Sequence, residues 1–301
     1  MSLAVVAPEL PAESTVRLAY QTPLGTLYQG DCLDLMATMA DESVDLMFAD
    51  PPFNLGKMYG AHYDDVKAEA EYVAWSREWI QEGVRLLSTG GAFFLYNIPR
   101  WNVLNGAFMS ELGMMFRHWV AIDIKFGLPI PGRLYPSHYS MLYYTKGKPR
   151  SFTRPRVPVP TCRHCGGDIK DYGGHRSKLN PEGLNLTDVW TDIPPVRHRS
   201  TKNREANELS EKLLERVITI ASEPGDRLFD PFGGSGTTYA VAERMHRHWT
   251  GVELGDVEPI INRLSGVQNL VQLPGRGDAG KQRESGHSKP KDGQHQVTLF
   301  Q

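Results

Sequence analysis

The chain has few cysteines and no long hydrophobic run. Its three cysteines, Cys32, Cys162 and Cys165, are too few for the disulfide framework of a small secreted protein. Its longest apolar stretches, such as residues 92–96, are far shorter than the roughly 20 residues that cross a bilayer. No basic segment followed by an apolar core opens the sequence, so no signal peptide is indicated. These absences predict a cytoplasmic protein with no membrane segment.

Net charge is also small, but the positive charge is gathered in one segment. The formal net charge is −2, which taken alone argues against a nucleic-acid partner. Residues 146–204, however, hold 13 Lys/Arg against 5 Asp/Glu, a local charge of +8 that leaves −10 for the rest. A basic segment in an acidic protein is a candidate contact for phosphate groups. The alternative is a solvated loop region without a partner.

Strands and helices alternate outside this basic, proline-rich segment, which reads as a long insertion. A strand, a turn, a helix and a second strand in succession form the unit of a doubly wound parallel sheet. The expected strands are residues 27–29, 44–49, 92–97, 141–145, 227–230 and 249–253, and the expected helices are residues 70–87, 209–220 and 237–247.

The predicted domain organisation follows from composition. Residues 1–14 are expected to be a flexible N-terminus, and residues 15–270 one large α/β domain that contains the insertion 146–204. Residues 275–301 are rich in Gly, Lys, Gln and Ser and are expected to be a disordered tail.

A glycine-rich turn, Asp230-Pro231-Phe232-Gly233-Gly234-Ser235-Gly236-Thr237-Thr238, follows the strand that ends at Asp230. Glycines let the backbone approach a ligand closely, and N–H groups at a helix start bind carboxylate or phosphate. No Lys-Ser/Thr follows the last glycine, so the turn is not a P-loop, and the third glycine of a nicotinamide fingerprint would fall at Tyr239. Glu253 ends the next strand, where it can accept hydrogen bonds from a ribose. The combination predicts a nucleoside cofactor such as S-adenosylmethionine, whereas a glycine turn alone would as readily be structural.

A second motif, Asp50-Pro51-Pro52-Phe53, follows the strand over residues 44–49. The lone pair of an exocyclic base amine is delocalised into the ring, and an enzyme can draw it out by accepting both amine hydrogens. Here the Asp50 carboxylate and the Pro51 carbonyl are the candidate acceptors. The two prolines stiffen the segment and remove two N–H donors, and Phe53 can stack on an extruded base. The alternative is a strand that the prolines merely end.

The two motifs, in this order, resemble the β-class amino-methyltransferases of DNA, and the resemblance covers residues 17–265. It implies a Rossmann-like methyltransferase fold, with a mixed, mostly parallel sheet, helices on both faces and residues 146–204 as an inserted recognition region. It also implies S-adenosylmethionine as cofactor and double-stranded DNA as partner. By position it implies catalytic roles for Asp50, Pro51, Pro52 and Phe53, and cofactor binding by Asp31, Asp230, Phe232, Gly234, Gly236, Thr237 and Glu253.

The chain departs from this family before the helix over residues 209–220. Many relatives carry a His-Pro-Thr-x-Lys-Pro-like stretch there, whereas residues 203–210 read Asn-Arg-Glu-Ala-Asn-Glu-Leu-Ser. The residues that bind the methionine end of the cofactor are therefore only partly assigned.

The sequence favours one target base and leaves the biological setting open. Aspartate at position 50 favours adenine N6, because cytosine-N4 members more often have serine there. A cytosine-N4 enzyme, or one acting on RNA, is an alternative within the class. From another class, the chain could be a nucleic-acid-binding module with a degenerate site, but the intact Asp50 and Glu253 count against that. The enzyme could stand alone or belong to a restriction–modification pair.

Two further motifs lie outside this argument. Cys162 and Cys165 have the spacing of a zinc knuckle, with His175 or His198 as candidate further ligands; two free thiols are the plainer interpretation, and methyl transfer needs no metal. The segment Gln296–Phe300 resembles the Gln-x-x-Leu-Phe peptides that dock on the bacterial DNA sliding clamp, although such a short pattern also arises by chance. A homodimer is left open.

Overall fold

The computed structural model describes residues 15–272 except residues 57, 60–62, 65–66, 125–130, 133, 135, 160, 163, 169, 171–172, 175–177 and 195–207. The predictions of a flexible segment at residues 1–14 and of a disordered tail at 275–301 lie outside the described residues. Within them, no helix is long and apolar enough to cross a membrane.

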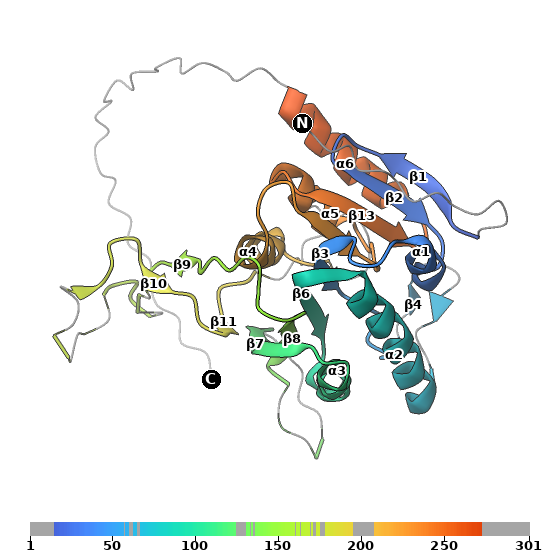
Figure 1. The fold of residues 1–301 in the computed structure, drawn as a ribbon. Helices are drawn as coiled ribbons and strands as arrows, with labels where there is room; N and C mark the ends of the chain where they lie inside the picture. The colour runs from blue at the N-terminus through green and yellow to red at the C-terminus, as the bar shows by residue number, and fades with distance from the viewer. Residues whose placement is uncertain are drawn as a thin grey trace, which may run out of the picture.

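Nine strands form one mixed, mostly parallel sheet in the order β1-β2-β13-β12-β3-β6-β8-β7-β11 (Figure 1). The strands from β2 to β6 run parallel, whereas β1 and β8 run antiparallel to their neighbours. The predicted fold class is confirmed. The strands are β1 (Arg17–Gln21), β2 (Gly25–Gln29), β3 (Val44–Ala49), β6 (Leu87–Asn97), β7 (Met115–Asp123), β8 (His138–Thr145), β11 (Val189–Trp190), β12 (Arg227–Asp230) and β13 (His248–Glu253).

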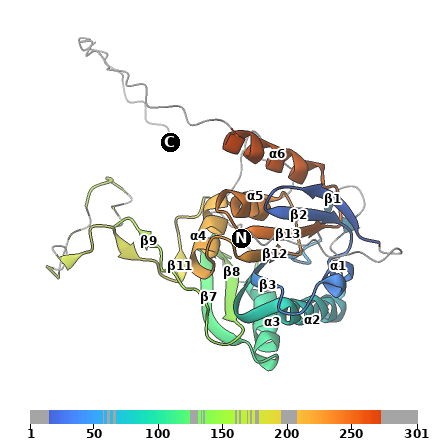
Figure 2. The ribbon, with the colours of Figure 1, turned by 45° about the horizontal axis from the view of Figure 1, so that its top comes forward.

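Helices cover both faces of this sheet. Figure 2 shows α5 and α6 on one side of the strands and α2 and α3 on the other. Side chains alternate along each strand, so Leu46 and Phe48 of β3 join the core with α4, α5 and α6, while Met47 and Ala49 join the core with α1, α2 and α3. The helices are α1 (Cys32–Thr38), α2 (Glu69–Leu86), α3 (Pro99–Glu111), α4 (Glu211–Ala221), α5 (Thr237–Arg244) and α6 (Glu258–Gln272).

Gly90 and Gly91 lie inside β6, which begins at Leu87 directly after α2 and so starts earlier than the strand expected over residues 92–97. Gly90 has a φ of +82°, and the register between β3 and β6 shifts between Val44 and Leu46. The pair therefore forms an irregularity in the strand, which a glycine with positive φ allows.

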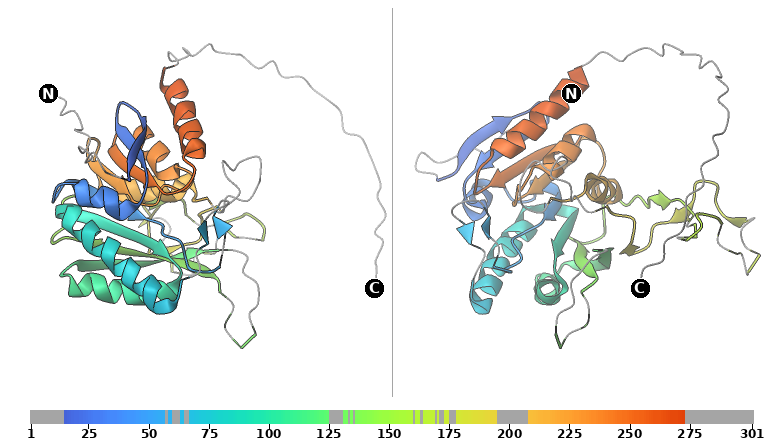
Figure 3. Two further views of the ribbon diagram at one scale, coloured as in Figure 1. Left: turned by 90° about the vertical axis from the view of Figure 1, so that its right-hand side faces the viewer. Right: turned by 180° about the vertical axis from the view of Figure 1, so that it is seen from behind.

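The insertion after β8 contains more regular structure than its composition indicated. Its strand β11 pairs parallel with β7 and so extends the main sheet. A short hairpin of β9 (Arg156–Val157) and β10 (Leu184–Asn185) projects away from the sheet (Figures 1 and 3). A second small hairpin, β4 (Met58–Tyr59) with β5 (Tyr63–Asp64), follows the Asp-Pro-Pro-Phe segment.

The chain leaves β3 toward β6 on one side and leaves β12 toward β13 on the other. This reversal of strand order places a topological switch point between β3 and β12. In open α/β sheets, ligands bind beyond the carboxyl ends of the strands at such a point.

Candidate active site

The two predicted motifs meet at the switch point. Strands β3 and β12 pair in parallel, with Leu46 opposite Leu228 and Met47 opposite Phe229, so both motifs follow at the same edge of the sheet. The charge of Asp50 is one of the causes that raise the pKa of Asp230, so the acids that follow the two strands interact electrostatically.

Each of four neighbouring parallel strands is followed or ended by one predicted site acid. In the order β2, β13, β12 and β3, these acids are Asp31, Glu253, Asp230 and Asp50. The backbone N–H of Gly30 donates to the carbonyl of Glu253 (3.1 Å), which ties the ends of β2 and β13 together. The sheet edge therefore brings together residues that lie more than 200 positions apart in the sequence.

Aromatic rings surround the segment after Asp50. The ring of Phe53 lies 5.6 Å from that of Tyr139 and 6.0 Å from that of Tyr96, and the two tyrosine rings are 5.4 Å apart. Burial raises the pKa of both tyrosines, and the nearby charge of Asp50 raises each further. Asp50 thus lies beside an aromatic cluster of Phe53, Tyr96 and Tyr139, the kind of surface on which a base can stack.

Tyr96 and Tyr139 were not among the site residues predicted from the sequence. Tyr96 lies near the end of β6, next to β3, and only its position beside a site strand could have indicated a role. Tyr139 reaches the site because β8 pairs antiparallel with β6, a pairing that spans more than 40 residues and leaves no local signal.

The glycine turn is shaped by close packing as well as by backbone conformation. Gly234 and Gly236 have φ values of +55° and +74°, which side-chain-bearing residues rarely adopt. A Cβ atom at Gly236 would lie 2.6 Å from Cγ2 of Ile260. Gly236 directly precedes α5, whose first residue is Thr237. Any larger residue at Gly236 would force the turn away from α6.

Glu253 joins the glycine turn to the end of β13. Its Oε2 accepts a hydrogen bond from the N–H of Gly234 (2.7 Å), and its Oε1 accepts one from the N–H of Gly255 (2.9 Å). Asp31 caps α1 by accepting from the N–H of Leu33 (2.8 Å). Each carboxylate oxygen can accept more than one hydrogen bond, so both acids keep capacity for the hydroxyls of a nucleoside. A narrow glycine turn between two acids fits such a ligand.

Phe232 is anchored in the core beside this turn. Its ring packs at 5.1 Å from that of Trp79, edge to face, and at 5.8 Å from that of Trp75. Both tryptophans belong to α2, so the helix before β6 fixes the start of the glycine turn.

Asp230 is buried, with a relative exposure of 1%. Burial raises its pKa to about 8, and the charges of Asp50 and Glu253 add to the rise, whereas hydrogen bonds from the Thr238 side chain and the Phe232 N–H oppose it. The Phe232 N–H lies 2.9 Å from the Asp230 Oδ1. At neutral pH the free protein therefore holds Asp230 mainly in its protonated form.

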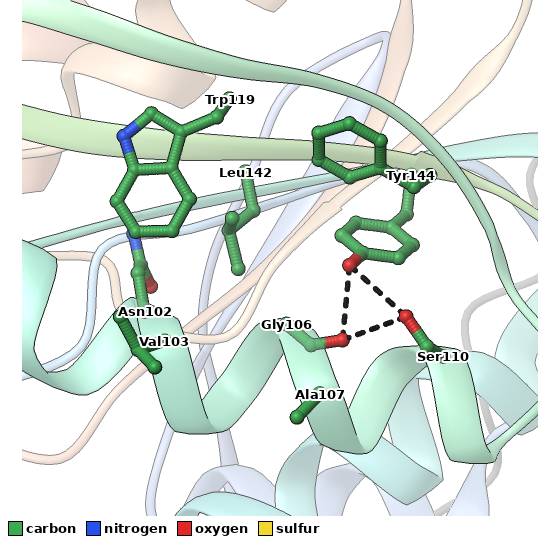
Figure 4. Close-up of a pocket in the computed structure, with 9 residues that line it drawn as sticks. Asn102, Val103, Gly106, Ala107, Ser110, Trp119, Leu142 and Tyr144 are labelled. Carbon is green, nitrogen blue, oxygen red and sulfur yellow. Dashed lines mark hydrogen bonds between the residues drawn. The ribbon is translucent and has the colours of Figure 1, made fainter.

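The remaining candidate features do not join this site. The hollow of about 270 Å³ between α3 and strands β7 and β8 contains no predicted site residue, and its lining carries no carboxylate, imidazole or amine (Figure 4). Within the described part of the chain, no three metal-ligating side chains come together. The candidate zinc ligands His175 and His198 lie outside that part.

Comparison with known sequences identifies the family. The family model described as DNA methylase matches residues 44–258, and the chain belongs to that family. It is 51% identical to the type II methyltransferase M.BamHI of Bacillus amyloliquefaciens over 258 residues, and this match covers 85% of this chain and 61% of that protein. It is 27% identical to M1.MboII of Moraxella bovis over 83% of this chain and 98% of that protein. The chain thus spans less than two thirds of the length of M.BamHI.

Solved structures support the fold. The PvuII DNA methyltransferase, described as cytosine-N4-specific, matches with a TM-score of 0.54 at 21% identity, over 81% of this chain and 93% of that one. The complex of M1.HpyAVI with S-adenosylmethionine matches with a TM-score of 0.53 at 18% identity, over 81% of this chain and 99% of that one. The resemblance to β-class DNA amino-methyltransferases is confirmed.

The raised pKa of Asp230 predicts a pH dependence of stability. Unfolding exposes the carboxyl group, which then ionises near pH 4, so between about pH 4 and pH 8 unfolding releases a proton and the free energy of unfolding falls as pH rises. Asp230→Asn removes this term. Its stability relative to wild type should therefore increase by roughly 1 kcal/mol per pH unit between pH 5 and pH 7, measured by urea unfolding without cofactor.

Asp256→Asn, at an exposed position after β13, is the control for loss of a carboxyl group. Parallel stability profiles for wild type and Asp230→Asn would contradict a protonated Asp230.

Proposed function

We propose that the protein transfers a methyl group from S-adenosylmethionine to an exocyclic amino group of a base in double-stranded DNA, and that the amine is adenine N6. The main support for this proposal is that the two predicted motifs lie side by side at one edge of the sheet. Asp50 and its aromatic cluster lie at the end of β3, directly beside the glycine turn at the end of β12. Membership of the DNA methylase family supports the reaction class.

Asp50 is the group that acts on the target amine. Its carboxylate accepts a hydrogen bond from one amine hydrogen, and the Pro51 carbonyl accepts one from the other. The two acceptors pull the nitrogen lone pair out of conjugation and hold it in the direction of attack, so catalysis comes from orientation and electrostatics. As the methyl group bonds to nitrogen, its bond to the sulfonium sulfur breaks, and the amine then loses one proton, for which the Asp50 carboxylate is the proposed acceptor.

The aromatic cluster and the glycine turn bind the two reactants. Phe53, with Tyr96 and Tyr139, offers the stacking surface for a base extruded from the duplex. Asp230, Phe232, Gly234, Gly236 and Thr237 form the cofactor turn, with Glu253 for the ribose and Asp31 near the adenine. S-adenosylmethionine, when bound, supplies the methyl group from a positively charged sulfonium.

Asp50→Ala should lower methyl transfer by several orders of magnitude while the protein still binds S-adenosylmethionine, because the carboxylate acts on the amine and not on the donor. Gly236→Asp should instead abolish cofactor binding, and methyl transfer with it, because the turn has no room for a side chain at that position. Tritium transfer into DNA and equilibrium cofactor binding measure the two effects separately. Near-normal turnover of Asp50→Ala would rule out the two-acceptor mechanism.

Adenine N6 is favoured by the aspartate at position 50, and cytosine N4 is the second candidate. The second is supported by the cytosine-N4-specific PvuII enzyme among the structural neighbours. Nuclease digestion of the methylated DNA followed by mass spectrometry should yield N6-methyladenosine as the modified nucleoside. N4-methylcytidine as the sole product would overturn the adenine assignment and leave the rest of the mechanism intact.

The basic insertion is the proposed contact for DNA phosphate, and its arginines differ in their surroundings. Arg156 donates to the carbonyl of Gly183 (3.0 Å) and pairs with Glu182, so it holds the β9–β10 hairpin. Arg154 is exposed and lies over the ring of Phe152 (5.8 Å). Arg154 is thus the better phosphate ligand of the two.

Arg154→Gln should weaken DNA binding and lower the slope of log affinity against log salt by about 1, the effect of one lost phosphate contact. Arg17→Gln, on the opposite edge strand β1, loses the same charge and should bind DNA as wild type does. Fluorescence anisotropy at several salt concentrations measures both. An unchanged salt slope in Arg154→Gln would show that Arg154 does not contact a DNA phosphate.

Two partner predictions stay open. Docking of the segment Gln296–Phe300 on a sliding clamp would tether the enzyme near newly made DNA, and this segment lies outside the described residues. A homodimer likewise stays a prediction.

A further inference from the structure

Three carbonyl groups follow Asp50, and the described residues bind two of them. The hydroxyl of Tyr72 donates to the carbonyl of Pro52 (2.7 Å), and Nε1 of Trp101 donates to the carbonyl of Phe53 (2.8 Å). No hydrogen bond from a described residue reaches the carbonyl of Pro51. The described residues thus hold the carbonyls of Pro52 and Phe53 by hydrogen bonds, and leave the Pro51 carbonyl available to accept a hydrogen bond from the target amine.

The two prolines restrict some backbone torsions of the segment and leave others free to rotate. Each pyrrolidine ring fixes its own φ, and a residue that precedes proline is restricted in ψ, so Asp50 and Pro51 are restricted by the covalent structure itself. The first soft torsion of the segment is ψ of Pro52, and the next are those of Phe53. The hydrogen bonds from Tyr72 and Trp101 act on these torsions, which set the direction of the Phe53 ring relative to Asp50.

Tyr72 and Trp101 are themselves held firmly. Both are 2% exposed, and their rings pack at 4.6 Å. The side-chain amide of the fully buried Asn97 donates to the Tyr72 hydroxyl (3.1 Å), and the Oγ of Ser140 donates to the carbonyl of Asn97 (2.9 Å). Helices α2 and α3 and the end of β6 thus converge on one short segment.

Other buried polar groups of α2 have no hydrogen-bond partner among the described residues. On the same helix α2, Trp79 is fully buried and its Nε1 has no hydrogen-bond partner among the described residues. The same is true of the Ser76 hydroxyl, one turn from Tyr72. Within the described structure, the helix leaves these groups unpaired but pairs Tyr72 with the catalytic segment.

We propose that Tyr72, held by Asn97, and Trp101 are positioning residues that fix the Phe53 ring and the Pro52–Phe53 peptide relative to the Asp50 carboxylate. The inference rests on the proposed methyl transfer to a base amine. Tyr72 and Trp101 contact neither reactant. They act through the Asp-Pro-Pro-Phe segment, so their loss should affect the reaction step and leave the binding of cofactor intact.

Tyr72→Phe removes one hydroxyl and keeps the ring. Its kcat should fall about tenfold, the effect of one hydrogen bond of about 1.4 kcal/mol, while the KM for DNA and the Kd for S-adenosylmethionine stay within about twofold of wild type. Trp101→Phe, which removes the second donor, should show the same split. With 2-aminopurine in place of the target base, both variants should give higher fluorescence than wild type at saturating enzyme, because the base stacks less well on Phe53.

Tyr143→Phe is the matched control. Tyr143 is also buried, on β8, and its hydroxyl has no hydrogen-bond partner among the described residues, so its removal should leave kcat unchanged. Thermal unfolding of all variants separates loss of positioning from loss of folding.

Wild-type kcat in both folded variants would overturn the proposal, as would a fall in kcat matched by an equal loss of cofactor affinity. If the wild-type protein transferred no methyl group to DNA, the proposed function would fail instead, and this result is distinct because it appears without any substitution.

Discussion

The parallel pairing of β3 with β12 brings the two sequence motifs to one edge of the sheet. It joins segments about 180 residues apart, and an ion pair fixes its register at the amino ends of the two strands. The Asp45 carboxylate accepts hydrogen bonds from the backbone N–H and the guanidinium of Arg227, each at 3.0 Å. Because strands in parallel advance together, this contact at one end determines which residues meet at the other. There the Asp-Pro-Pro-Phe segment and the glycine turn emerge side by side, and neither could act on the other's ligand if the register slipped by one residue.

The electrostatics of the site follow from unequal burial of its acids. Burial raises the pKa of Asp230 to about 8, which favours its protonated form and lowers the negative charge beside Asp50 in the free protein. Glu253 accepts hydrogen bonds from the backbone N–H groups of Gly234 and Gly255, which fix its carboxyl group between the turn and the end of β13. Asp50 lies among aromatic rings, where a carboxylate interacts more strongly with an amine hydrogen than it would in water. The three acids therefore lie in different surroundings although they share one sheet edge.

The parts of the fold that were predictable have local signals. Residues 44–49 and 249–253 are short apolar runs that end at turn residues, and the helix over residues 70–87 shows its buried face at helical spacing, so the strands β3 and β13 and the helix α2 could be predicted. Candidate catalytic and cofactor residues could be named from the sequence because proline and glycine mark the two motifs. The features that were not predicted from the sequence depend on tertiary contacts. Strand β11 is two residues long and forms only because β7 offers an open edge. In the sequence, four aromatics look like ordinary core residues, and only their packing around one segment makes them candidates for a role: Tyr72, Tyr96, Trp101 and Tyr139.

In the proposed reaction, the target amine donates its hydrogens to Asp50 and to the Pro51 carbonyl. A crystal structure of the protein with S-adenosylhomocysteine and a duplex that contains its methylation site would measure this directly. We expect an extruded base on the Phe53 ring, with its exocyclic nitrogen at hydrogen-bond distance, about 2.7–3.2 Å, from an Asp50 carboxylate oxygen and from the Pro51 oxygen. A base seated in the same complex with its amine directed away from Asp50, or beyond about 4 Å from both oxygens, would contradict it.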